Sequence, residues 1–306
     1  MFATLFQLMG MMFLLILVGT ALRALKIITD EGKKCLTDII IYAILPCNII
    51  KAFCTDLGDH ILKRFSVLIL VAAASQILAL FTAKMMYRKM NKRDIPIYQY
   101  ATVCSNSGFI GNPLAEGIFG STGLIYASVF LLPQRVVMWT AGVSFFSKTD
   151  NKKNAYKKVL THPCMLATYI GFAIMLLPIQ LPSVLSKAIA SVSGCCTPMT
   201  MMYMGVILAD VNVKELIDRQ QLYYCFLRLI ALPLILYLGC LALKIDPLIT
   251  GVSVLLMGMP AGSTTSLLAA KYGADERTAT KCVVLSTLLS IITIPLWSMI
   301  LLSGIS

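Results

Sequence analysis

Residues 104–120 read CSNSGFIGNPLAEGIFG and place glycine, serine and asparagine around Pro113 in the middle of an apolar region. Proline removes a backbone hydrogen bond and clashes with the preceding turn, so a helix here should break or kink. Asn112 is suited to cap a new half-helix with Pro113 at its first position. In hydrocarbon, unwound backbone persists only where protein buries it or where it lines a cavity. The motif therefore predicts an interrupted helix beside a buried site.

A second interruption is predicted by MPAGSTTS, residues 259–266, in which Pro260 can begin another half-helix. Ser263, Thr264 and Thr265 would then surround the N-terminus of that half-helix. Two helix N-termini that face one cavity offer free N–H groups and positive dipole ends, which suit an anion. The alternative is a pair of ordinary kinked helices, since proline and glycine are common in membrane spans.

The whole chain has the composition of a membrane protein. Of its 306 residues, 58% are hydrophobic and 13% are charged, whereas soluble domains have about 45–50% and about 25%. These values argue against a water-soluble enzyme, a disordered chain and a collagen-like repeat. A bilayer core about 30 Å thick requires roughly 20 apolar helical residues to cross it. An all-α polytopic protein with ten spans is expected, at residues 2–25, 34–54, 62–87, 95–118, 121–147, 159–180, 183–209, 219–243, 247–271 and 275–303.

The net charge of +12 is explained by the positions of the lysines and arginines. Of these 26 residues, 19 fall in loops that follow odd-numbered helices and five in loops that follow even-numbered helices. Basic loops stay on the cytoplasmic side, so we expect a multi-pass protein of the cell inner (plasma) membrane with both termini extracytoplasmic. The charges form no concentrated basic patch, and no nucleic-acid partner is expected.

The sequence contains no pattern typical of an enzyme or a metal site. Its ten cysteines lie mostly in apolar runs without a CxxC pair, and its two histidines are far apart. We therefore expect no metal site. The sequence also lacks HExxH, GxSxG, paired intramembrane aspartates and any nucleotide-binding motif. No cofactor, nucleotide or enzymatic activity is expected.

The basic loop at 148–158 divides the chain into two sets of five expected helices. Five is an odd number, so the second set enters the membrane from the opposite face, as in inverted-repeat transporters. Prolines fall at matching places in the two sets. Pro46 in helix 2 corresponds to Pro198 in helix 7, and Pro113 in helix 4 corresponds to Pro260 in helix 9. The pattern favours a secondary transporter whose site lies where the repeats meet.

Three motifs resemble those of the auxin efflux carrier (PIN-like) family, and the short central loop matches its prokaryotic members. They are NSGFIGNPLAEGIFGSTG at 106–123, TPMTMMYMGVIL at 197–208, and MPAGSTTSLLAAKYGAD at 259–275 followed by STLLSIITIP. The resemblance implies two inverted five-helix repeats in which the broken helices 4 and 9 cross at Pro113 and Pro260. It also implies scaffold helices at 1–58 and 159–210 that form a homodimer, transport helices at 59–147 and 211–306, and a cytoplasmic loop at 148–158.

The resemblance also suggests roles for single residues. Asn106 matches the family asparagine that contacts the substrate carboxylate, although an amide bridging two helices is the alternative. Plant carriers have an acidic residue in helix 3, where this chain has Ala74 and Ser75. A proton-linked role for that acid therefore does not carry over.

Two arginines lie inside expected helices. Arg135 is deep in helix 5, where a cation usually faces a cavity or a partner. It would hold an anionic substrate or the carbonyl ends of a broken helix, or else pair structurally with Glu116. Arg228 is about nine residues from the cytoplasmic end of its helix, and we expect it to snorkel to the interface. The candidate substrate-binding residues are Asn106, Asn112, Pro113, Pro260, Ser263, Thr264, Thr265 and Arg135.

These features together predict a transporter of small organic anions that works by alternating access around the crossing helices. The resemblance suggests carboxylates such as malate or malonate, or auxin-like acids. A sodium-coupled symporter of the bile-acid type shares the inverted five-helix plan and is one alternative. A membrane receptor that binds organic acids without moving them is the other. The expected partners are the substrate, the lipid bilayer and a second copy of the chain.

Overall fold

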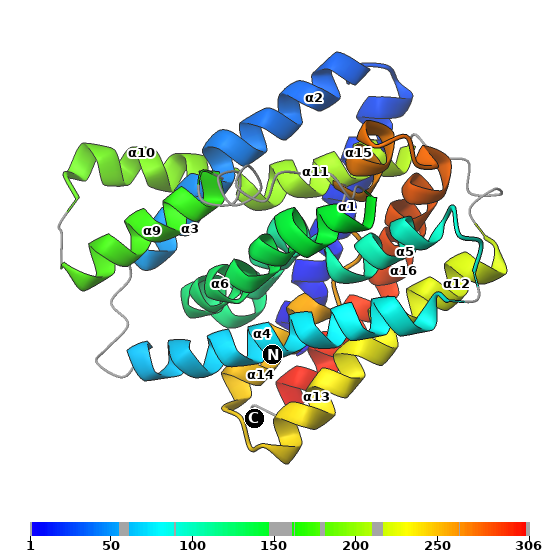
Figure 1. The fold of residues 1–306 in the computed structure, drawn as a ribbon. Helices are drawn as coiled ribbons and strands as arrows, with labels where there is room; N and C mark the ends of the chain where they lie inside the picture. The colour runs from blue at the N-terminus through cyan, green and yellow to red at the C-terminus, as the bar shows by residue number, and fades with distance from the viewer. Residues whose placement is uncertain are drawn as a thin grey trace.

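A computed structural model describes residues 2–54, 61–88, 90–146, 161, 163–177, 181–209, 217–262 and 264–303. Throughout these ranges the regular structure is helical, apart from one isolated β-bridge (Figure 1). The first half of the chain contributes α1 (Phe2–Ala24), α2 (Asp30–Ile39), η1 (Ile40–Ile44), α3 (Leu45–Phe53), α4 (Ile61–Met86), α5 (Ile95–Val103), η2 (Ser107–Gly111), α6 (Asn112–Val137), η3 (Met138–Gly142) and α7 (Val143–Phe146).

The second half contributes α9 (Pro163–Leu176), α10 (Ser183–Gly194), α11 (Cys196–Ala209), α12 (Arg219–Phe226), η5 (Leu227–Ala231), α13 (Leu232–Ala242), α14 (Pro247–Met257), α15 (Thr264–Lys271) and α16 (Glu276–Ser303). In the described part of the chain, five stretches are long and apolar enough to cross a membrane: Arg64–Met86, Asn112–Val137, Ser183–Ala209, Arg219–Ala242 and Glu276–Ser303. Shorter apolar helices accompany them at Gly10–Ala24, Pro163–Ile174 and Pro247–Met257. The chain is therefore built as a polytopic helical membrane protein, as its composition predicts.

Two boundaries illustrate how local sequence sets the helices. The expected separation between residues 118 and 121 falls at Gly120, where φ of 69° and ψ of −163° bend α6. A positive φ suits glycine because it has no Cβ. The helix expected from residue 34 begins earlier, at Asp30, because the side chain of Thr29 accepts a hydrogen bond from the backbone N of Gly32. This is the usual role of threonine at a helix start.

The helices pack in two groups. In one, α1 packs on α11, while α3 packs on α9 and α10. In the other, α4 packs on α5 and α6, and α14 packs on α6, α13 and α16. Figure 1 shows α3, α9 and α10 gathered on one side of the molecule and α4, α12 and α13 on another. The groups meet where α1 and α11 contact α16, and where α3 contacts α6.

The closest helix contact lies between α1 and α11. A Cβ added at Gly205 would overlap the carbonyl oxygen of Ile16, and one added at Gly19 would overlap the carbonyl oxygen of Met202. The Oγ1 of Thr20 donates a hydrogen bond of 3.1 Å to the carbonyl oxygen of Gly205. Small residues at such contacts let two backbones approach closely in a membrane, where dispersion contacts and interhelical hydrogen bonds drive association.

Aspartates cap three helices of the second half. Asp218 Oδ1 accepts from the backbone N of Gln221 at 2.8 Å, at the start of α12. Asp246 caps α14 in the same way. Asp275 Oδ1 accepts from the backbone N of Arg277 at 3.1 Å, at the start of α16. A carboxylate at this end satisfies free N–H groups and balances the helix dipole.

Replacing Asp275 with alanine should lower the free energy of unfolding by about 1 kcal/mol at neutral pH. The Oγ1 of Thr278 donates to Asp275 Oδ2 at 2.8 Å, and this bond lowers the pKa of the Asp275 carboxyl below its ordinary value. The native state thus favours the ionised form, so its stabilisation is complete at neutral pH and is lost as the pH falls through the lowered pKa. Thermal melting in detergent at several pH values measures this effect.

Thr278→Val tests the same effect, because it removes the hydrogen bond that lowers the pKa of the Asp275 carboxyl. This variant should lose its stabilisation at a higher pH than the wild type. Burial, and repulsion from Asp275, raise the pKa of the Asp94 carboxyl. Removing Asp275 relieves that repulsion, so the net loss should not exceed about 1 kcal/mol. Identical melting of Asp275→Ala and the wild type at neutral pH would contradict the capping role.

Candidate functional site

The two predicted interruptions lie against each other. The helix formed by α5 stops before residues 104–106, and the helix formed by α14 stops before residues 258–262. An isolated antiparallel bridge joins Ser105 to Ala261. Two backbone hydrogen bonds hold it, from Asn106 N to the Pro260 oxygen (2.8 Å) and from Gly262 N to the Cys104 oxygen (2.9 Å). Backbone groups released by one break thus satisfy those released by the other, as buried polar groups require.

Side chains from two further helices fasten this bridge. Gln134 on α6 donates from Nε2 to the Ser105 carbonyl oxygen at 2.9 Å and accepts from Ser105 Oγ at 3.1 Å. Ser286 on α16 accepts from the backbone N of Ala261 at 3.0 Å. Ser107 Oγ donates to the carbonyl oxygen of Leu256 at 2.8 Å, which joins η2 to the end of α14. The interruptions are therefore held rigidly from several directions.

Arg228 is the cation at these breaks, and the expectation that it snorkels is wrong. Its side chain is 2% exposed. The Nε donates to the carbonyl oxygen of Met259 at 3.0 Å, and Nη1 donates to that of Thr102 at 2.8 Å. The broken helices supply these acceptors inside the protein, so the guanidinium has no need to reach the interface. The contact with broken-helix carbonyls considered for Arg135 is thus made by Arg228.

Asn106 occupies the turn between the bridge and η2. It is 4% exposed, and its Nδ2 lies 3.5 Å from the sulfur of Met204 on α11. A thioether is a weak acceptor, so the hydrogen bond that this amide N–H makes to sulfur is weak. A carboxylate oxygen would be a much stronger one. The Asn106 amide is therefore a donor that an anionic ligand can engage.

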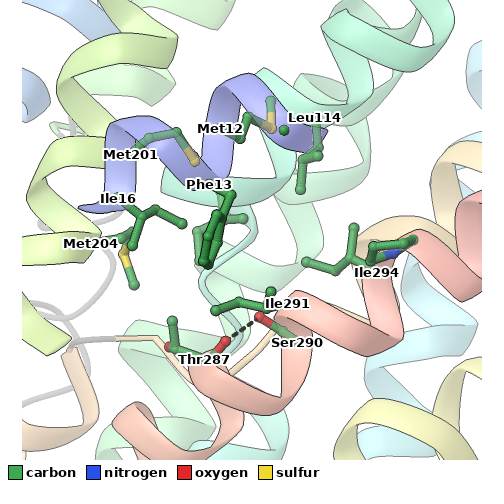
Figure 2. Close-up of a pocket in the computed structure, with 13 residues that line it drawn as sticks. Met12, Phe13, Ile16, Leu114, Met201, Met204, Thr287, Ser290, Ile291 and Ile294 are labelled. Carbon is green, nitrogen blue, oxygen red and sulfur yellow. Dashed lines mark hydrogen bonds between the residues drawn. The ribbon is translucent and has the colours of Figure 1, made fainter. Parts of the chain in front are cut away.

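Met204 also lines an apolar cavity of about 330 Å³ (Figure 2). Its walls come from α1, α11, α16 and the η2–α6 segment, so it lies between the two packing groups. Met12, Phe13 and Ile294 are among the side chains in Figure 2. The lining includes two hydroxyl side chains from α16. Thr287 and Ser290 each donate to a backbone carbonyl of the same helix, at 2.7 Å.

Comparison with known proteins identifies the family. A family model described as "Membrane transport protein" matches residues 4–159 and 152–298, which together cover nearly the whole chain. The chain belongs to this family. It is the auxin efflux carrier family that the sequence motifs resemble.

Relatives of this membrane transport protein are described as transporters. An "uncharacterized transporter" of Methanothermobacter thermautotrophicus is 26% identical over 94% of this chain and 95% of its own. A "putative malonate transporter" of Rhizobium meliloti is 22% identical over 86% of this chain and 85% of its own. An "uncharacterized transporter" of Methanocaldococcus jannaschii is 24% identical over 95% and 96%. The protein is therefore a membrane transporter and not an enzyme.

In the structure of the transporter, neither half-helix begins at the residue that the sequence predicts. Asn112 does not cap a half-helix, because the chain is already helical through η2 and α6 continues directly from it. The break lies instead at residues 104–106. Pro113 is in the first turn of α6, and the wide π-helical turn before it accommodates the missing N–H. Pro260 lies inside the second break, and α15 begins only at Thr264.

The remaining candidates fall near the breaks to different degrees. Thr264 Oγ1 accepts from Tyr100 Oη at 3.2 Å. The buried oxygens Asn112 Oδ1 and Thr265 Oγ1 have no hydrogen-bond partner among the described residues. Arg135 is buried and follows Gln134 directly in α6. Ser263 lies outside the described residues.

Sequence reasoning missed Gln134 and underestimated Arg228. Both lie in apolar helices, at LLPQR and CFLRL, and each is a polar side chain that hydrocarbon would not tolerate without a partner. A polar side chain in an apolar helix needs hydrogen-bond partners within the protein. This requirement is the sequence feature by which both residues could be found. Glu116, considered as a partner for Arg135, accepts from Asn48 Nδ2 at 3.4 Å.

Proposed function

We propose that the protein is a secondary transporter of small organic anions, and that their carboxylate binds at the paired helix interruptions. The observation that carries this proposal is the Asn106 amide, which is buried beside the bridge and whose N–H has, among the described residues, a thioether as its acceptor. A carboxylate that replaces the sulfur gains a charge-assisted hydrogen bond. The oxygen of Thr265 lies just beyond the second break and lacks a partner among the described residues. Its hydroxyl can donate a hydrogen bond to an ionised carboxylate.

The electrostatics of the breaks favour an anion. Helix N-termini carry partial positive charge and free N–H groups, and η2 and α15 both begin at this place. Arg228 donates to carbonyls at the ends of α5 and α14 and so offsets the partial negative charge of these two C-termini, which would otherwise repel an anion. In our proposal Arg135, which is also buried on α6, strengthens the attraction. Malonate and malate fit this charge, and a relative is described as a "putative malonate transporter".

The proposed architecture has ten crossings in two inverted five-helix repeats. Helices α1, α2, α3, α9, α10 and α11 would form the scaffold and the homodimer contact, and the helices within 59–147 and 211–306 would form the transport unit. The two packing groups support this division, as does the bridge between the two breaks. The apolar cavity lies at the boundary between the groups. Alternating access would then be a movement of the transport unit along this boundary.

A thermal-shift screen of the purified protein with mono- and dicarboxylates tests the function. A ligand present at 100 times its Kd should stabilise the native state by about 2.7 kcal/mol. Ligands that stabilise the protein are then offered to proteoliposomes in uptake assays. We expect at least one small carboxylate to bind and to be transported. Binding without transport would favour a receptor, and a screen in which no carboxylate stabilises the protein would contradict the proposal.

A further inference from the structure

We infer that Arg228 is a tethered cation that takes the place of a bound metal ion at the helix interruptions, so that the transporter works without sodium. The inference rests on the proposed function for its transport readout. Its physical basis is that one guanidinium donates to a carbonyl of each broken helix, Thr102 in α5 and Met259 just after α14. A single side chain therefore contacts both interrupted helices.

The acceptors of Arg228 are groups that a coupling cation would use. In transporters with discontinuous helices, unwound carbonyls and half-helix C-terminal ends coordinate sodium or a proton. Here α5 and α14 both end at the breaks. Each helix C-terminus carries about half a negative charge, so the two together carry roughly the charge that one guanidinium neutralises. No compensating charge is left for a metal ion to supply.

Arg228 is held in this place by its own helix. It lies in the π-helical turn η5, which precedes Pro233 as η2 precedes Pro113. Pro233 has no N–H to offer the carbonyl of Leu229 four residues earlier, and this carbonyl accepts from Trp297 Nε1 at 2.9 Å. One turn earlier, Tyr224 Oη donates to the carbonyl oxygen of Ala101 at 3.2 Å. These contacts attach the π-turn to α16 and α5 and so fix the direction of the guanidinium.

The charge of Arg228 is also not cancelled by an acid. Among the described residues, no carboxylate forms an ion pair with it. The side chains of Tyr224, Cys104 and Tyr87 also interact electrostatically with its guanidinium. A permanently charged group on the transport unit, balanced by helix ends alone, stays in place whether the transporter is loaded or empty. Sodium would add a second positive charge against the first.

The test compares Arg228→Ala, Arg228→Lys and Arg23→Ala with the wild type. Arg23 is a control away from the breaks. Its Nη1 also donates to a backbone carbonyl, that of Ile28 at 2.9 Å in the loop after α1, and its Nη2 pairs with Asp30. Thermal melting and carboxylate uptake are measured in sodium, potassium and choline chloride at equal ionic strength. Each measurement is repeated with millimolar guanidinium chloride, which can occupy the space that Arg228→Ala leaves.

We expect wild-type uptake and melting to be the same in all three salts. Arg228→Ala should lose about tenfold or more of its uptake, because two hydrogen bonds from a charged donor are removed. Guanidinium should restore part of that loss and raise the melting temperature of Arg228→Ala alone. The uptake and the melting temperature of Arg228→Lys should lie between those of the wild type and of Arg228→Ala, since an ammonium lacks the planar fork that reaches two acceptors. Arg23→Ala should behave as the wild type in every salt.

Three results would overturn the inference: wild-type uptake that requires sodium, full activity of Arg228→Ala, or recovery of Arg228→Ala with sodium as good as that with guanidinium. If Arg228→Ala does not fold, the measurements on the wild type and on Arg228→Lys in sodium, potassium and choline chloride still test the inference. Melting needs no substrate, so it tests Arg228 even if no carboxylate is transported. In that event the proposed function fails while the inference about Arg228 stands or falls on the melting curves.

Discussion

Replacing Asn106 with alanine is expected to weaken carboxylate binding and uptake by about 10- to 100-fold, the usual cost of a lost hydrogen bond to a charged group. The backbone bridge should survive, because its hydrogen bond comes from the main-chain N of residue 106, which alanine retains. Only the weak contact with the Met204 sulfur is lost in the empty protein. The effect should therefore appear in the Kd and KM and hardly at all in the melting temperature.

Two companion variants make this prediction specific. Met204→Leu removes the sulfur but keeps the Asn106 donor, and its affinity should stay within a few-fold of the wild type. Asn91→Ala is a matched change in a loop away from the breaks, where the Asn91 side chain accepts from the backbone N of Arg93 at 3.3 Å. It should transport normally. Wild-type affinity and uptake in Asn106→Ala would rule out the amide as a substrate contact.

Replacing Gly205 with leucine should prevent the assembly of α1 with α11. A side chain there would enter the space of the Ile16 carbonyl, and no rotamer avoids the clash because it begins at Cβ. The helices would have to separate, which also breaks the hydrogen bond from Thr20 to the Gly205 carbonyl. Overpacking of a core typically costs 1–3 kcal/mol, and a displaced helix should cost about 3 kcal/mol or more. We expect little monodisperse protein from this variant.

Gly239→Leu is the matched control for that experiment. Gly239 is also in an apolar helix, but a Cβ added there meets nothing within 4 Å. Its yield, size-exclusion profile and melting temperature should equal those of the wild type. A stable Gly205→Leu protein with unchanged melting would show that the contact between α1 and α11 is looser than the structure indicates.

Much of the fold follows from the sequence because apolar helices leave long, uncharged runs. The break at Gly120 and the starts of α10, α12 and α14 agree with the sequence within a residue or so. The positions of the two central breaks do not. Proline identifies a missing N–H, and the π-turn η2 accommodates it without unwinding the chain. The chain unwinds instead at residues 104–106, where it can pair with a partner about 155 positions away.

Part of the candidate site can be located from the sequence. The family resemblance indicates Asn106, and the backbone of this residue takes part in the bridge. Gln134 and Arg228 were not selected, because their role depends on carbonyls that only the folded chain brings within reach. Sequence can reveal that a buried polar residue needs a partner, whereas the identity of the partner is a property of the tertiary structure. This explains why Arg135 was favoured over Arg228.

In the proposed function, carboxylates bind at the paired breaks and are carried across the membrane. Counterflow of radiolabelled malonate in proteoliposomes preloaded with unlabelled carboxylate tests it most directly, because exchange needs neither a gradient of ions nor a known direction. We expect the wild type to accumulate label and Asn106→Ala to accumulate about 10- to 100-fold less. Equal accumulation by the two proteins would contradict the proposed function, as would the absence of accumulation with every carboxylate that stabilises the purified protein.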